Sequence, residues 1–458
     1  MGEFKSSGFE RAWLSAPPGH RLRPVRYEAY DQVNGLLHAP VTYDYEPISP
    51  LPTEMPSDQW IGESLRRFVL GEFGKPPDRG SCPAECIIGS RVEVSHRIAA
   101  MYLEACEHVA YSGLVKGVAR ASGASMAHQL LTLLSDPILG NAANSKNIDL
   151  LAFTSQLEHL NSEHQRVYFL VPSFPFKDQN PFRTEASGGH VDLGEIALLI
   201  RLHTLSLAIY QVHPFGVDWV IVSDGMSYAQ LFRMDVTQVR AYNYRLRLFR
   251  DILNIYSTVN IIDLRDLCVR AGTGPDGVPA IDVFSGYIAE RMQGLVSSQS
   301  DLANTFDVLI RGMKWNINYR DAIKSYGLSR EETWQLLNNQ PGPDIRRNGN
   351  VWAEFHTAAT EAAYKYAAIN LAIRYCDLFH RFFPIGLRAT THPKAGQVAI
   401  PSLGSVMPWN GVAVVRERIE TINSVRTEPL YKICSGSGAI TAHCVSDSNN
   451  VFYYGVEG

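Results

Sequence analysis

The stretch that decides the fold is Val171–Thr184, Val-Pro-Ser-Phe-Pro-Phe-Lys-Asp-Gln-Asn-Pro-Phe-Arg-Thr. It follows the apolar run 166–171, which is typical of a buried strand. The prolines of the stretch cannot donate hydrogen bonds to a neighbouring strand, so the strand must end and a stiff loop must begin. This loop carries two cations, Lys177 and Arg183. In an α/β protein such a loop is either a ligand site or a solvated surface segment.

The residues that follow alternate between helical and strand patterns. Asp192 followed by Glu195 indicates a helix with an N-terminal capping box, and Asp235 marks the start of a second helix. The continuous apolar runs 217–222 and 259–262 predict two further strands. Strands that alternate with helices in this way form right-handed βαβ units. We therefore expect an α/β fold, with a Rossmann-like, mainly parallel sheet flanked by helices.

Parallel strands place their carboxyl ends at one edge of the sheet, so the loops after the three strands should converge. Lys177 lies beside aromatic residues, where desolvation favours imine chemistry or a phosphate contact. Arg183 offers a bidentate contact to a phosphate or carboxylate. The alternative for both is a solvated loop cation.

The loop after the second strand is Ser223-Asp224-Gly225. Glycine permits a close backbone approach to a ligand, and Asp224 could bind a sugar hydroxyl or a substrate ammonium. The third loop begins at Asp263, so two of the three strand exits carry a carboxylate. Such a set of polar residues predicts a pocket at this edge of the sheet.

A pair of extended segments is predicted at 386–400. Residues 387–392 form one strand, 393–396 the turn and 397–400 the returning strand. His392 lies near the tip of this hairpin, where an imidazole can act as general acid or base near neutral pH. The alternative for a lone histidine at a turn is simple exposure.

The rest of the chain divides into three parts. Residues 1–90 are rich in Pro, Ser and Gly and predict an irregular N-terminal arm. Residues 91–425 form the α/β domain with additional helical segments, including a long helix at 351–381. Residues 426–458 form a Ser-, Gly- and Asn-rich tail that we expect to be weakly ordered.

Composition excludes several functions. The formal net charge of -4 argues against a nucleic-acid partner, and no run of apolar residues approaches the ~18 that a membrane span needs. The first residues contain no apolar leader, and the seven scattered cysteines fit a reduced, cytoplasmic protein. Cys82 and Cys86 are the only close pair, so we expect no metal. No phosphate-binding or hydrolase motif is present.

Six short motifs in the chain resemble the pyoverdine/dityrosine biosynthesis family, which includes isonitrile synthases. The resemblance covers roughly residues 160–415. The motifs occur in the family's order: Phe174-Pro175-Phe176-Lys177, Asn180-Pro181, Asp192 with Glu195, Ser223-Asp224-Gly225, Arg388 to His392-Pro393, and Pro408-Trp409. The resemblance implies an enzyme that converts the amino group of an amino acid to an isonitrile, with ribulose 5-phosphate as the carbon source and no cofactor.

The resemblance also implies roles for individual residues. Lys177, Asp224 and His392 become the catalytic candidates. The candidates for binding the amino acid and the sugar phosphate are Arg183, Ser223, Gly225, Arg388, Lys394, Trp409 and Asn410. A pathway partner of the iron/2-oxoglutarate oxygenase class is also implied.

Two departures from the family pattern keep other functions open. Asn410 stands where the family commonly has His, and Thr-Thr-His-Pro replaces Ser-Ile-His-Pro at the motif that ends in Pro393. The chain also has more residues before the Lys177 motif than compact bacterial members. The alternatives are an enzyme that formylates or otherwise modifies an aromatic amino acid, as in dityrosine formation, and a non-catalytic binder of sugar phosphate or amino acid. The sequence does not identify the amino acid.

Overall fold

The structure is a computed structural model of the chain. It describes residues 7–27, 31–33, 36–38, 41–72, 82, 88–92, 95–120, 123–163, 165–177, 179–184, 190–213, 215–274, 276–338, 349–384, 386–391, 393–416, 419–435, 440–445 and 451–456.

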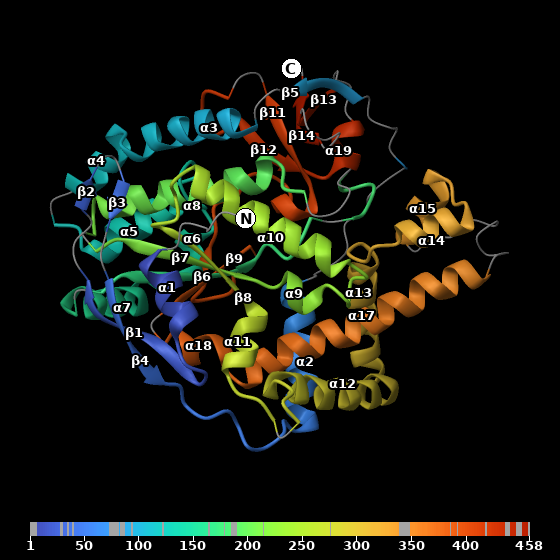
Figure 1. The fold of residues 1–458 in the computed structure, drawn as a ribbon. Coiled ribbons are helices and arrows are strands. Elements are labelled where there is room, and N and C mark those ends of the chain that lie inside the picture. Colours follow the sequence, from blue (N-terminus) through green and yellow to red (C-terminus); the bar gives the residue numbers. More distant parts are fainter. Residues whose placement is uncertain are drawn as a thin grey trace.

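A five-stranded parallel sheet lies at the centre of the molecule (Figure 1). Its order is β10-β9-β6-β7-β8, and every neighbouring pair is parallel. The strands are β6 (Val167–Ser173), β7 (Val217–Ser223), β8 (Val259–Asp263), β9 (Leu387–Thr390) and β10 (Val398–Ala399). The predicted α/β class and its three central strands are therefore confirmed.

The register of the central strands brings their carboxyl ends into one row. Ser173 of β6 pairs with Ser223 of β7, and Ser223 pairs with Asp263 of β8. Since all three strands end at this row, the loops that follow them leave from the same edge. The predicted convergence is confirmed.

The hairpin predicted at 386–400 is wrong. β9 and β10 are parallel, with Ala389 opposite Val398. A tight turn is present, since Gln397 N donates to the carbonyl of Lys394 at 2.9 Å, but it does not pair the two strands antiparallel. At this turn the chain lies against α6 (Asn144–Asn147), where Gly396 N donates to the carbonyl of Asn147 at 2.9 Å. The side chain of Asn144 then accepts from Ala399 N and donates to its carbonyl. This contact returns the chain to the sheet in the same direction.

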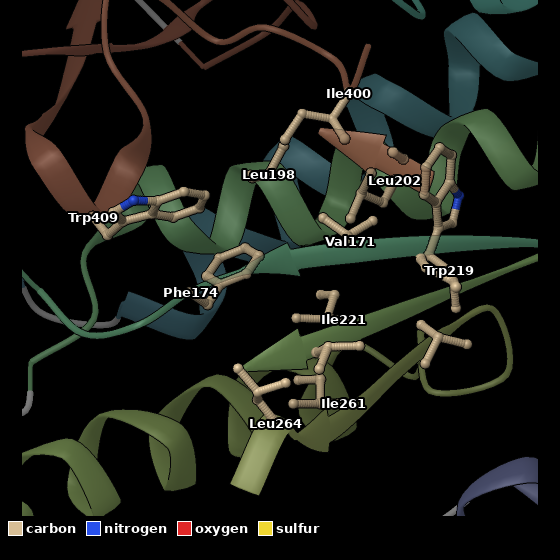
Figure 2. Packing of buried hydrophobic residues seen from close by; sticks show 14 of the residues in the cluster. Val171, Phe174, Leu198, Leu202, Trp219, Ile221, Ile261, Leu264, Ile400 and Trp409 are labelled. Atoms are coloured by element: carbon tan, nitrogen blue, oxygen red, sulfur yellow. The ribbon is translucent and has the colours of Figure 1, made fainter. Parts of the chain in front are cut away.

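Helix α8 (Leu193–Tyr210) packs between the parallel sheet and a second sheet. Its capping box from Asp192 and Glu195 is present as predicted, and α10 (Val236–Ile252) starts after Asp235. By length and composition α8 alone, among the described helices, could cross a membrane, but 94% of it is buried in the molecule. Figure 2 shows its apolar side chains over the strands of the central sheet. Burial on both sides explains why α8 is apolar around most of its circumference and why even its few polar residues, such as Arg201 and His203, are buried.

The described residues of the C-terminal region form regular elements, contrary to the expectation of a weakly ordered tail. It forms a mixed sheet of order β12-β11-β14-β13-β5. The strands are β5 (Ile88–Val92), β11 (Val412–Arg416), β12 (Val425–Glu428), β13 (Ile440–Val445) and β14 (Val451–Val456). Phe452 and Tyr454, which alternate along β14, are buried and give this strand one apolar face.

A helical layer lies beyond the carboxyl edge of the central sheet (Figure 1). It contains α2 (Asp58–Glu72), α12 (Ala280–Ser298), α13 (Ser300–Lys314) and α17 (Gly349–Tyr375), which pack on one another. The long helix predicted at 351–381 is interrupted at Asp377, whose φ of 47° lies in the left-handed region, and continues as α18 (Leu378–Phe382).

The described residues of the N-terminal arm form regular, packed elements, contrary to the expectation of an irregular arm. Helix α1 (Gly8–Ser15) lies against β8, where the Glu10 carboxylate accepts from Ile261 N at 2.9 Å. β1 (His20–Tyr27) pairs antiparallel with β4 (Val41–Pro47). Because β8 is an edge strand, α1 covers hydrogen-bonding groups that would otherwise be unpaired.

The remaining elements are β2 (Asp31–Val33), β3 (Leu36–His38), α3 (Ser95–Ala110), α4 (Gly113–Arg120), α5 (Met126–Ser135), α7 (Leu150–Ser162), α9 (Gly225–Tyr228), α11 (Leu264–Arg270), α14 (Arg320–Tyr326), α15 (Arg330–Leu337), η1 (Pro408–Asn410) and α19 (Leu430–Cys434).

Cys434 is disulfide-bonded, so the expectation of a fully reduced chain is wrong.

Candidate active site

A cavity of about 570 Å³ opens at the carboxyl edge of the parallel sheet. Ser173 at the end of β6, Asp224 after β7 and Leu264 after β8 line it, together with Arg388 on β9. The loop expected to hold the ligand also contributes through Pro175. This is the place where parallel α/β sheets bind ligands.

The structure separates the predicted site residues into three groups. Those that line the cavity are Asp224, Arg388, Lys394, Trp409 and Asn410. Those that lie behind its wall are Lys177, Arg183, Ser223 and Gly225. His392 lies outside the described residues, although Thr391 beside it lines the cavity.

Asp224 is the carboxylate that faces this cavity from the central strands. Burial raises its pKa from an ordinary 3.8 to about 7, and the charge of Asp263 adds to this effect. Its Oδ1 is buried and has no hydrogen-bond partner among the described residues. A carboxyl group with this pKa exchanges protons readily near neutral pH. Asp224 therefore has both the position and the pKa of a general acid or base.

Tyr228 lies one helical turn beyond Asp224 and also lines the cavity. Burial raises its pKa well above its ordinary value, so the hydroxyl keeps its proton. Asn370 Nδ2 donates to the Tyr228 hydroxyl at 3.0 Å. Because this contact uses an acceptor position of the oxygen, the hydroxyl proton can be donated to a ligand.

The inner wall of the cavity is aromatic. Phe232 contacts Phe176 at 5.7 Å and Tyr366 at 5.9 Å between ring centroids. Tyr366 in turn contacts Tyr228 at 5.1 Å and Phe68 at 5.8 Å. These five rings come from α2, the loop after β6, the segment at α9, and α17. They form a continuous apolar surface that suits a bulky apolar group.

The mouth of the cavity is charged. Three exposed cations line it: Arg374 near the end of α17, Arg388 on β9 and Lys394 in the β9–β10 connection. Exposed His380 and Asp377 lie on the same lining. Arginine and lysine side chains in this arrangement can bind a phosphate while remaining partly hydrated.

Lys177 is buried in a cluster of charges behind this cavity. Its Nζ lies 2.8 Å from Asp192 Oδ2, 2.9 Å from Glu195 Oε1 and 2.8 Å from the carbonyl oxygen of Pro408. Its side chain is only 2% exposed. The three acceptors match the three protons of the ammonium, so Lys177 joins the loop after β6 to the start of α8 and to η1.

The protonation of this cluster follows from its charges. Burial lowers the pKa of Lys177, but the carboxylates of Asp192 and Glu195 raise it above its ordinary value. Burial and the charge of Asp192 raise the pKa of Glu195 well above its ordinary value, against the effect of Lys177. The ammonium of Lys177 therefore keeps its proton between the two carboxyl groups, as a buried ion pair requires.

Ser223 and Gly225 hold the two central loops together. Ser223 Oγ lies 3.1 Å from the carbonyl oxygen of Phe174, and a β-carbon at position 225 would lie 1.7 Å from the carbonyl oxygen of Pro175. The close approach that Gly225 permits is thus to protein backbone. Phe174 itself has a φ of 57°, and its ring lies 5.1 Å from that of Trp409 (Figure 2). A left-handed non-glycine residue of this kind is a sign of a constrained site.

Arg183 contacts the cavity wall from outside. Its guanidinium donates to Asn316 Oδ1 at 2.7 Å and lies over the ring of Trp315 at 5.4 Å. Asn316 lines the cavity. Arg183 therefore positions a lining residue.

Among the described residues, no group of three or more His, Cys, Asp or Glu side chains has the spacing of a metal site. The polar groups of the cavity suit organic anions and hydroxyl groups.

Comparison with known proteins identifies the family. Residues 157–428, more than half of the chain, match the pyoverdine/dityrosine biosynthesis protein family. The chain belongs to this family. The matched range contains the parallel sheet, α8 and the loops at the carboxyl edge. The family resemblance inferred from the six motifs is confirmed.

A solved structure supports the fold. The chain resembles the crystal structure of the PvcA protein from Pseudomonas aeruginosa with a TM-score of 0.51 and 16% identity, over 72% of this chain and all of PvcA. At this identity the likeness concerns the fold. No curated protein sequence matches the chain.

Sequence reasoning missed several lining residues on helices. Phe68, Tyr366, Asn370 and Arg374 line the cavity from α2 and α17. On a helix, apolar residues that face a cavity have the same spacing as those that face the core, so pattern alone cannot separate them. Arg374 follows the buried residues Leu371, Ala372 and Ile373, and only its place near the helix end hints at a ligand.

Proposed function

We propose that this member of the pyoverdine/dityrosine biosynthesis family is an isonitrile synthase, which converts the amino group of an L-amino acid to an isonitrile with ribulose 5-phosphate as carbon donor. The observation that carries the proposal is the position of Asp224, whose pKa is about 7, in a cavity with three cations at its mouth. This reaction joins an amine to the ketone of a sugar phosphate. It requires an anion site and a proton-transfer group within one enclosed space.

The cavity supplies a group for each requirement. Arg374, Arg388 and Lys394 at the mouth would bind the phosphate. The aromatic inner wall would take the side chain of the amino acid. The reacting amine and ketone would then lie near Asp224.

Asp224 would transfer protons during imine formation. When the amine attacks the ketone carbon, the nitrogen loses protons and the ketone oxygen leaves as water, so one group must both accept and donate. Asp224 can do so near neutral pH, and Tyr228 can donate a hydrogen bond to the oxygen that becomes negative. Asn410 in the place of the family's common His cannot transfer protons. His392 remains a proposed proton-transfer residue on the resemblance alone.

Lys177 would act as a positioning residue. Its contact with the Pro408 carbonyl fixes the segment that carries Trp409 and Asn410 into the cavity wall. By the family resemblance we further propose a cytoplasmic enzyme with a pathway partner of the iron/2-oxoglutarate oxygenase class.

Incubation with ribulose 5-phosphate and a panel of L-amino acids, followed by trapping with a tetrazine, tests the proposal. An isonitrile from at least one amino acid is expected. A formamide as the final product would favour the dityrosine-type alternative. Binding of both substrates without any product would favour a non-catalytic protein.

A further inference from the structure

Helix α2 forms part of the cavity although it lies outside residues 157–428, which match the family. Phe68 lines the cavity and contacts Tyr366. Gly71, three residues later, lies against Lys394 at the mouth, because a β-carbon at position 71 would lie 2.6 Å from Lys394 Cε and 2.8 Å from its Nζ. Residues three apart share a helix face, so one face of α2 meets both the aromatic wall and a cation of the mouth.

Several contacts hold α2 in this position. Arg66 pairs with Asp301 of α13 at 2.6 Å, and Arg291 of α12 donates to Asp58 at 2.7 Å. On α2, Ile61, Leu65 and Val69 are fully buried within the helical layer. The exposed ion pairs contribute little alone, and the buried residues supply most of the anchoring. These contacts therefore fix the positions of Phe68 and Gly71 relative to the cavity.

We propose that α2 determines the specificity of the cavity: Phe68 bounds the space for the apolar side chain of the substrate, and Gly71 leaves room for the Lys394 ammonium to reach the phosphate. This inference rests on the proposed function for the identity of the two ligands. The physical reasons differ for the two positions. Phe68 provides contact area, whereas Gly71 provides the absence of a side chain.

The two positions can be tested separately by equilibrium binding, which needs no turnover. The probes are L-tryptophan and L-alanine for the apolar space and inorganic phosphate for the mouth, measured by calorimetry on the full chain. For Phe68→Ala we expect about tenfold weaker binding of L-tryptophan, unchanged binding of L-alanine and unchanged binding of phosphate. Phe68→Leu, which keeps most of the buried area, should shift L-tryptophan binding in the same direction by less.

Gly71→Ala should give the opposite pattern. The added methyl group must displace the Lys394 ammonium, so we expect about tenfold weaker phosphate binding and unchanged L-tryptophan binding. Gly62→Ala is the matched control on α2, since its β-carbon meets no atom closer than 3.6 Å. Leu70→Ala is the control for Phe68, because Leu70 is 73% exposed. Both controls should bind all probes like the wild type.

Each outcome decides the inference. Wild-type affinities in folded Phe68→Ala and Gly71→Ala would overturn it, as would equal loss of all three probes in either variant. A wild-type protein that binds the probes but makes no isonitrile would refute the proposed function and leave the role of α2 to be judged from the variants. A wild-type protein that binds neither L-tryptophan nor phosphate would overturn this inference, whereas the isonitrile assay with the full panel of amino acids decides the proposed function.

Discussion

The ammonium of Lys177 donates a hydrogen bond of 2.8 Å to the carbonyl oxygen of Pro408, and the next residue, Trp409, lines the cavity. Lys177 is thus one residue removed from the ligand surface. Its remaining contacts are to Asp192 and Glu195 at the start of α8. Lys177 therefore holds the segment that lines the cavity and does not itself line it.

Lys177→Met should destabilise the protein by about 3 kcal/mol, because it leaves buried carboxyl groups without their cation. Denaturant unfolding measures this loss, with exposed Lys146→Met as the control. Turnover should fall with a pH profile like that of the wild type. A variant with full stability and no turnover would instead place Lys177 in the chemistry.

Asp224→Asn should change the pH dependence of stability. The folded pKa of about 7 lies above the ordinary 3.8, so between these values the folded state binds more protons than the unfolded state. The free energy of unfolding of the wild type therefore decreases as pH rises through this window, because Asp224 must lose its proton while buried. The amide of the Asp224→Asn variant does not titrate, so its free energy of unfolding lacks this decrease.

We expect the Asp224→Asn variant to match the wild type near pH 4 and to exceed its free energy of unfolding by about 1 to 4 kcal/mol above pH 7. Unfolding curves across the window measure this difference. Exposed Asp276→Asn should show none of it. A constant difference between Asp224→Asn and the wild type would mean that the carboxyl group titrates normally.

Gly225→Ala should cost about 3 kcal/mol of stability, because its β-carbon would overlap the Pro175 carbonyl and separate the two central loops. Gly294→Ala in α12 is the control, since it meets no atom within 4 Å and should be neutral or stabilising. Thermal unfolding compares the two. Equal melting temperatures would show that the loops can separate without cost.

Arg374→Ala and Arg388→Ala should each weaken phosphate binding on the order of tenfold, because each removes a charge-assisted contact at the mouth. Exposed Arg240→Ala on α10 should have no effect. Calorimetric titration with inorganic phosphate at low and high salt measures these changes. If neither substitution changes the affinity for phosphate, the anion does not bind at the mouth of this cavity.

The sequence predicts the sheet well and the site in part. Continuous apolar runs that alternate with helices predict parallel strands, as β6, β7 and β8 are. Because these strands are parallel, Asp224 directly after β7 lies at their shared carboxyl edge. The parallel direction of β9 and β10, in place of the expected hairpin, was not predictable, because it depends on a contact with Asn144, which is 255 residues away from Ala399. The burial of Lys177 was not predictable for the same reason, because its partner Pro408 in η1 is 231 residues away in the sequence.

The proposed reaction makes an isonitrile with a carbon from ribulose 5-phosphate and protons moved by Asp224. Uniformly carbon-13-labelled ribulose 5-phosphate, unlabelled L-amino acid and tetrazine trapping test it directly by mass spectrometry. We predict carbon-13 in the isonitrile from the wild type and a rate about 100-fold or more lower for Asp224→Asn. An unlabelled isonitrile, no isonitrile with any amino acid, or full activity of Asp224→Asn would contradict it.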